Sequence, residues 1–178
     1  KVNVTYMSNN VGIGIQDFLE LRENHKFYID KTSFIKDWWE SGDSVTLITR
    51  PRRFGKTLNM SMVEEFFSVN YAGRGDLFKG LSIWEGEKYQ KLQGTYPVIS
   101  LSFAKIKESN YQMTRKKICQ QLTELYAKNS FLLEGDLLYK TEREYFNRVN
   151  VDMDDADATI ALNCLSDYLY RYYGKKVI

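Results

Sequence analysis

The sequence is poor in the residue types that build several common kinds of site. It contains one histidine, His25, so neither a histidine-based metal site nor a Ser-His-Asp triad is expected. Its two cysteines, Cys119 and Cys164, lie far apart without a C-x-x-C motif, and we interpret them as reduced, partly buried thiols. No apolar run reaches the roughly 18 residues of a membrane helix, and the start lacks a signal-peptide core. The prediction is a cytoplasmic protein without membrane contact.

The chain does have enough apolar material for a core. At 178 residues and 43% hydrophobic residues, it is expected to fold as one domain, with or without a helical subdomain. The net charge of +2, from 25 basic and 23 acidic side chains, neither indicates nor excludes nucleic acid, because a basic patch can occur in a balanced total.

The most informative stretch is a short apolar run, residues 45–48, that leads through a basic turn into Gly55, Lys56 and Thr57. A strand, a loop and a helix start in this order are typical of a phosphate-binding loop. The first N–H groups of a helix lack intrahelical partners and, with the helix dipole, attract anions. Gly55 lets the backbone approach a phosphate, Lys56 would reach the β- and γ-phosphates, and the Thr57 hydroxyl would bind Mg²⁺.

The match to the full pattern, G-x-x-x-x-G-K-[ST], is incomplete. Arg50 stands where the first glycine is expected, and Pro51 restricts it to extended geometry. A basic surface turn that caps a helix is therefore the alternative interpretation. The β-branched run before the loop and the apolar helix after it favour nucleotide binding. The candidate nucleotide-binding residues of the loop are Arg52, Arg53, Phe54, Gly55, Lys56, Thr57 and Leu58.

Three blocks of the sequence resemble the bacterial AAA-ATPase-like family: F-Y-I-D-K-T at 27–32, L-I-T-R-P-R-R-F-G-K-T-L-N-M-S-M at 47–62, and Y-P-V-I-S-L-S-F at 96–103. The resemblance covers residues 12–178 and leaves residues 1–11 as an N-terminal arm. It implies a P-loop ATPase domain, which in this family is often followed by a PD-(D/E)XK nuclease-like domain. The arginine in place of the first glycine is typical of the family.

The resemblance also implies roles for individual residues. ATP and Mg²⁺ are the implied cofactors, with Lys56 as the catalytic cation and Thr57 as the metal ligand. Asp30 and Lys31 are assigned to the neighbourhood of the adenine pocket, although an N-cap role for Asp30 is the alternative. Arg52 or Arg53 would contact the γ-phosphate or the nucleotide of a neighbouring subunit, which would require self-association, or would form a plain salt bridge.

The predicted fold class is α/β: a P-loop NTPase with a parallel sheet and flanking helices, truncated, with a mainly helical insert between residues 104 and 175. No apolar run closes in Asp-Glu, so the resemblance implies an N-terminal fragment that ends inside the Walker B strand after residues 177–178. Such a fragment is expected to hydrolyse ATP slowly or not at all. The expected strands are 27–29, 45–48 and 98–103, and the expected helices are 16–22, 33–41, 55–69, 85–93, 110–129, 137–148 and 157–173.

Two charged runs have competing interpretations. Arg115, Lys116 and Lys117 would form a solvated helix face or a nucleic-acid patch. Residues 152–157 carry four aspartates but no glycine, which favours a helix-capping linker over a calcium loop. Accordingly, two other functions stay open beside a Mg²⁺-dependent ATPase: a nucleotide-gated switch module without significant hydrolysis, and a nucleic-acid-associated ATPase linked to a nuclease-like domain.

Overall fold

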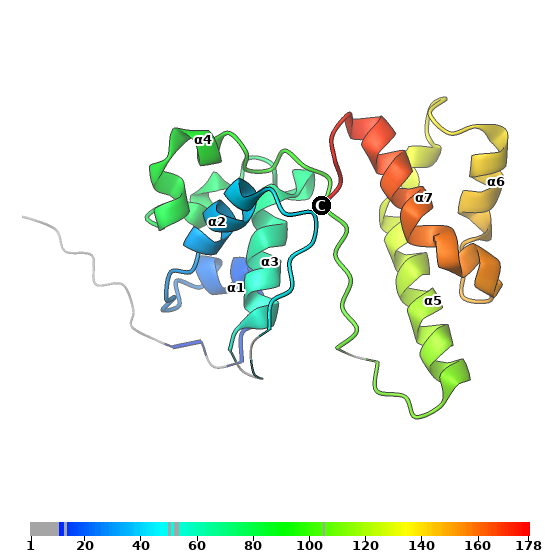
Figure 1. Ribbon diagram of the computed structural model, residues 1–178, viewed down its shortest axis with the longest axis horizontal. Coiled ribbons are helices and arrows are strands. Elements are labelled where there is room, and N and C mark those ends of the chain that lie inside the picture. Colours follow the sequence, from blue (N-terminus) through cyan, green and yellow to red (C-terminus); the bar gives the residue numbers. More distant parts are fainter. Residues whose placement is uncertain (1–10, 13, 50, 52–53, 105) are drawn as a thin grey trace, which may run out of the picture. The chain divides into compact units, whose positions relative to one another are not determined.

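The computed structural model describes residues 11–12, 14–49, 51, 54–104 and 106–178. The chain divides into two compact units, Lys1–Val98 and Ile99–Ile178. Both units are helical where they are described (Figure 1), and β-pairing there is limited to two isolated parallel bridges, Val11 with Phe27 and Ser68 with Tyr96. None of the described helices is long and apolar enough to cross a membrane.

The first unit is built from short helices around one longer helix. Its α-helices are α1 (Phe18–Glu23), α2 (Ser33–Ser41), α3 (Lys56–Phe67) and α4 (Glu87–Gln90), and its 3-10 helices are η1 (Val69–Tyr71), η2 (Gly75–Phe78) and η3 (Ser82–Glu85). Helix α1 packs against α3, and the Phe18 amide donates to the Ser61 hydroxyl at 2.7 Å. Several short elements therefore surround α3, which is the central helix of the first unit.

Aromatic side chains fill the centre of the first unit. The Phe18 ring stacks on Phe78 with centroids 5.2 Å apart, and Phe66 meets Phe78 edge-on at 5.1 Å. On the other side of α3, Trp39 from α2 stacks on Phe67 at 5.4 Å. Pairs of this geometry stabilise a core beyond their burial alone, and here they fix α1, α2 and η2 against α3.

The second unit is a helical cluster. It consists of α5 (Tyr111–Lys128), η4 (Ser130–Leu133), α6 (Lys140–Arg148) and α7 (Asp155–Tyr173), and Figure 1 shows α5 and α7 in contact along part of their length. The buried Tyr126 hydroxyl donates to the Ala161 carbonyl at 2.8 Å and joins α5 to α7. The unit has its own core, formed by Cys119, Leu122, Leu125, Tyr126, Leu132, Leu138, Tyr145, Phe146, Val149, Met153, Ala161, Leu165, Tyr168 and Leu169.

Most of the helices predicted from the sequence are confirmed. The predicted helix at 33–41 is α2, and those at 110–129, 137–148 and 157–173 correspond to α5, α6 and α7 with ends shifted by at most three residues. Residues 55–69 are α3 followed by η1, whereas the helix expected over 85–93 is only the four-residue α4. Local periodicity and capping residues are sufficient to specify these elements, because helix hydrogen bonds join residues close in sequence.

The predicted α/β fold with a parallel sheet is wrong, since the described residues contain no strand and no sheet. Residues 45–48 have no β-partner in the described part of the chain, and the apolar residues Val45 and Leu47 are 87% and 83% exposed. Residues 98–103 likewise form no ladder, although the Ile99 amide donates to the Ile178 carbonyl at 2.8 Å. An alternating pattern favours extended chain, but a sheet also needs neighbouring strands, which the pattern does not supply.

One of the aspartates before α7 caps the N-terminus of this helix. Asp154 is the N-cap, and its carboxylate accepts a hydrogen bond from the Asp157 amide at 2.7 Å. We expect Asp154→Ala to destabilise the second unit by about 1 kcal/mol, because an N–H group at the start of α7 loses its partner. Thermal unfolding followed by circular dichroism measures this loss. Asp152→Ala, which removes a neighbouring exposed carboxylate outside the helix, is the matched control and should unfold like the parent; equal losses would contradict the capping role.

Candidate functional site

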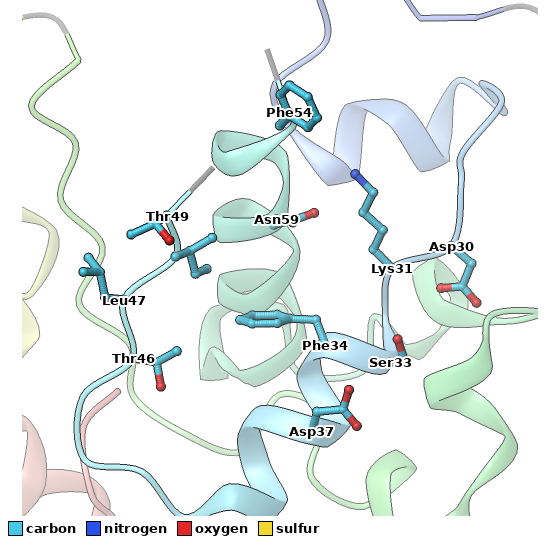
Figure 2. Close-up of a pocket in the computed structure, with 11 residues that line it drawn as sticks. Asp30, Lys31, Ser33, Phe34, Asp37, Thr46, Leu47, Thr49, Phe54 and Asn59 are labelled. Atoms are coloured by element: carbon cyan, nitrogen blue, oxygen red, sulfur yellow. The ribbon is translucent and has the colours of Figure 1, made fainter. Parts of the chain in front are cut away.

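A cavity of about 710 Å³ opens beside α2 in the first unit (Figure 2). This volume lies within the range of about 300–1,000 Å³ that small-molecule sites span. Its walls come from the start of α2, the chain at residues 46–49, and the start of α3. Eleven residues line it: Asp30, Lys31, Ser33, Phe34, Asp37, Thr46, Leu47, Ile48, Thr49, Phe54 and Asn59.

Helix α2 gives one face to this cavity. Ser33 and Asp37 lie four residues apart, and Phe34 and Asp37 three apart, so they fall on one side of the helix. Another side of α2 buries Ile35, which is fully inaccessible to solvent. The wall is therefore held by core packing behind it.

The first turn of α3 begins at Gly55. This residue is the N-cap of α3 with φ +72°, a left-handed conformation that favours glycine, and its carbonyl accepts from the Asn59 amide at 2.9 Å. The Lys56 ammonium donates to the Pro51 carbonyl at 3.0 Å. The amides of the first turn lack intrahelical acceptors by the geometry of a helix, so they are available to an anion. Thr57 is exposed on this turn, and Leu58 is half-buried.

The Asp30 carboxylate is the acceptor of a compact polar network. One oxygen accepts from the Thr32 amide at 2.8 Å and from the Thr32 hydroxyl at 2.7 Å, and the other accepts from the Ser82 amide at 2.8 Å. The Thr32 hydroxyl also accepts from the Ile83 amide at 3.2 Å. Burial alone would raise the pKa of Asp30, but the hydrogen bonds from Thr32 and Ser82 outweigh it and lower the pKa. The network ties the start of α2 to η3.

The residues predicted from sequence lie in three groups. Asp30, Lys31 and Phe54 line the cavity. Gly55, Lys56, Thr57 and Leu58 form the adjoining N-cap and first turn of α3 and are not among the lining residues. Arg52 and Arg53 lie outside the described residues.

Sequence reasoning missed most of the cavity wall. Ser33, Phe34 and Asp37 had a signal, namely the three- and four-residue spacing that places them on one face of a predicted helix next to Lys31. Residues 45–48 were expected to form a strand of the sheet, so the contribution of residues 46–49 to an open cavity was not foreseen. Asn59 had no signal beyond its place on the predicted helix.

Glu65, on the buried side of α3, was also missed. It is 1% exposed, and neither of its carboxyl oxygens has a hydrogen-bond partner among the described residues. Burial raises the pKa of Glu65 to about 8, and the negative charges of Asp17 and Glu64 act in the same direction. The Leu19 amide and the Ser61 hydroxyl act in the opposite direction on the pKa of Glu65, although they do not meet hydrogen-bond geometry, and they do not outweigh burial. At neutral pH this side chain is therefore mostly protonated inside the helix that carries the site.

The basic run on α5 has internal partners. Arg115 pairs with the Asp155 carboxylate at 2.5 Å and donates to the Met153 carbonyl at 2.6 Å. Lys117 pairs with Glu108 at 2.6 Å. These pairs satisfy two of the three cations within the second unit, which favours the solvated-face interpretation over a nucleic-acid patch.

Comparison with known proteins identifies the family. The family model described as "Predicted AAA-ATPase" matches residues 12–178. The chain belongs to this family. The match supports nucleotide use and an ATPase activity in general, and it covers both the cavity and the first turn of α3.

One curated relative is similar over part of the chain. The "Uncharacterized protein in vnfD 5'region" of Azotobacter chroococcum mcd 1 is 36% identical over 112 residues, which make up 62% of this chain. The aligned region is 20% of that relative, so the chain spans about a fifth of its length. No solved structure matches the chain.

Proposed function

We propose that the first unit binds ATP, with the phosphates at the first turn of α3 and the nucleoside in the cavity beside α2. Three features found together support this most. Gly55 has a left-handed backbone conformation, and a lysine and a threonine follow it directly. The preceding residue, Phe54, lines a cavity of about 710 Å³. The family match supports the same function independently of the cavity.

The chemistry of the first turn suits a polyphosphate. The amides of Lys56, Thr57 and Leu58 present partial positive charge, and the Lys56 ammonium adds a full charge one residue from Gly55. The Lys56 side chain would exchange its bond to the neutral Pro51 carbonyl for bonds to phosphate oxygens, which carry a full negative charge. Binding of an anion here would thus pair the ammonium with groups of opposite charge.

Mg²⁺ would fit beside this turn. Thr57 is exposed there and offers a hydroxyl oxygen, and Mg²⁺ in nucleotide sites takes one or two protein ligands together with phosphate oxygens and water. The ion would neutralise phosphate charge when bound. Thr57 would hold the ion, and Lys56 would stabilise the charge that develops on the terminal phosphoryl group.

The nucleoside end of the cavity is less polar. The Phe34 ring lies in the cavity wall between Lys31, at one end of the cavity, and Asp37, at the other (Figure 2). Leu47 and Ile48 line the same cavity. An aromatic ring beside aliphatic side chains gives a flat, apolar surface for a purine base. The absence of an N-K-x-D motif from the sequence favours adenine over guanine.

Titration calorimetry of the chain with ATP in the presence of Mg²⁺ tests this function. We expect saturable binding to one site, with GTP weaker than ATP. The proposal also holds that the intact protein hydrolyses ATP, which requires a residue that positions the attacking water. No heat of binding with any nucleoside triphosphate would contradict the proposal.

The intact protein is proposed to couple this site to a further activity. The resemblance implies one alternative, a nuclease-like domain elsewhere in the protein. Two further alternatives are a nucleotide-gated switch and self-association through Arg52 or Arg53. ATP binding by the full-length protein without measurable turnover would favour the switch.

A further inference from the structure

The Lys31 side chain extends toward the phosphate end of the site. A Cβ atom added to Gly55 would lie 3.7 Å from the Lys31 ammonium nitrogen, so this cation sits beside the backbone at the start of α3. Figure 2 shows the ammonium below Phe54, whereas Asp37 marks the opposite end of the cavity. No ion pair joins Lys31 to an acidic side chain among the described residues. Its charge is directed at the place proposed for phosphate.

The residues on both sides of Lys31 are fixed. Asp30 accepts three hydrogen bonds, two from Thr32 and one from the Ser82 amide, and Thr32 is fully buried. Figure 2 shows Asp30 turned away from Lys31, toward the green chain that contains Ser82. The Asp30 carboxylate is thus occupied by its own network, which argues against a direct contact with the nucleotide.

A second tether holds Lys31 to α3 itself. The Lys31 amide donates to the Tyr28 hydroxyl at 3.3 Å, and that hydroxyl donates to the Met62 sulfur at 3.1 Å. Burial raises the pKa of Tyr28 to about 12, so the hydroxyl keeps its proton and remains a donor to Met62. The backbone of Lys31 is therefore connected to the helix whose N-terminus its side chain approaches.

We infer that Lys31 binds the phosphates of the nucleotide from the α2 side, opposite Lys56, and that Asp30 is a positioning residue that holds Lys31 in place. This inference rests on the proposed function and deepens it. It replaces the expectation that both residues belong to the adenine pocket. A cation on a fixed backbone loses less conformational freedom on binding than one on a mobile loop, which is the advantage that the Asp30 network provides.

Binding of three probes tests the role of Lys31: ATP, inorganic triphosphate and adenosine. We expect Lys31→Met to weaken ATP and inorganic triphosphate by the same factor, about tenfold, because a charged hydrogen bond to phosphate is lost in both. Adenosine binding should be unchanged. Lys36→Met, on α2 but outside the cavity wall, is the matched control and should leave all three affinities as they are.

Variants of Asp30 test the positioning role. Asp30→Ala should weaken the binding of ATP and of inorganic triphosphate as much as Lys31→Met does, and leave adenosine binding unchanged. The double variant should bind no more weakly than Lys31→Met alone, because both substitutions remove the same interaction with phosphate. Asp30→Asn keeps an acceptor for Thr32 but places an NH₂ group opposite the Ser82 amide, so an intermediate loss is expected. A general loss of structure would instead weaken adenosine and ATP alike.

The outcomes separate the two proposals. If Lys56→Ala weakens ATP binding while Lys31→Met weakens only the ligands that contain adenine, or none of the three, the inference about Lys31 is overturned and the proposed function stands. Fully additive losses in the double variant overturn the role of Asp30. If the parent binds neither ATP nor inorganic triphosphate, the proposed function itself fails.

Discussion

Replacement of Lys56 by alanine is expected to lower the affinity for ATP about 100-fold. The ammonium would contact two phosphate groups, and each charge-assisted hydrogen bond contributes about 1.5–3 kcal/mol. The side chain leaves the first turn of α3 directly after Gly55, so no other described lysine can substitute for it from the same position. Titration calorimetry of parent and variant with ATP and Mg²⁺ measures the effect.

The control for this variant must account for the bond between the Lys56 ammonium and the Pro51 carbonyl, which is also lost. Circular dichroism shows whether the helices persist, and Lys91→Ala removes an exposed lysine elsewhere in the same unit. We expect Lys91→Ala to bind ATP like the parent. ATP affinity of Lys56→Ala within twofold of the parent would contradict the phosphate-binding role of this turn.

The stability of the first unit is expected to fall as the pH rises from 4.5 to about 8. Over this range Glu65 ionises in the unfolded chain, whereas burial keeps it protonated in the folded chain. Its pKa is about 8 in the folded chain, against an ordinary value of 4.5 for a solvated glutamate, so the folded state holds more protons than the unfolded state in this window. The loss from this one group is about 1.4 kcal/mol per pH unit. Below pH 4.5 both states are protonated, and above about 8 the penalty is complete.

Glu65→Gln removes this titration. We expect the variant to resemble the parent near pH 4.5 and to be more stable by about 3–5 kcal/mol at pH 8. All three tryptophans, Trp38, Trp39 and Trp84, lie in the first unit, so denaturant unfolding followed by tryptophan fluorescence reports on this unit. Glu64→Gln, on the adjacent position, should keep most of the pH dependence of the parent, because the charge of Glu64 only adds to the shift that burial causes. A parent whose stability is flat between about pH 5 and 8 would show that Glu65 is ionised in the folded chain.

The helices could be predicted because their determinants are local. Asn110 caps α5 through bonds to the amides two and three residues later, and Gly42 and Gly174 end α2 and α7 in left-handed conformations. Each of these signals is contained within a few residues of sequence. The strand prediction had no such local support, since the short apolar run at 45–48 is compatible with a strand in a sheet and with the exposed chain that is observed.

The candidate site was predictable only in part for the same reason. Gly55, Lys56 and Thr57 form a contiguous motif, so their place at a helix start followed from the sequence. The bond from the Ser82 amide to Asp30 joins residues 52 positions apart, and no sequence pattern predicts it. The unusual position of Glu65 did have a signal, because it follows Met62 by three residues and shares its buried face.

A backbone amide NMR titration of the chain with ATP and Mg²⁺ would show where the nucleotide binds. We expect the largest shift changes at Gly55, Lys56, Thr57 and Leu58, smaller changes at Lys31 and Phe34, and none in α5 or α7. Such a map would place the nucleotide at the first turn of α3. Saturating changes confined to the second unit, or an unchanged spectrum at high ATP concentration, would contradict the account.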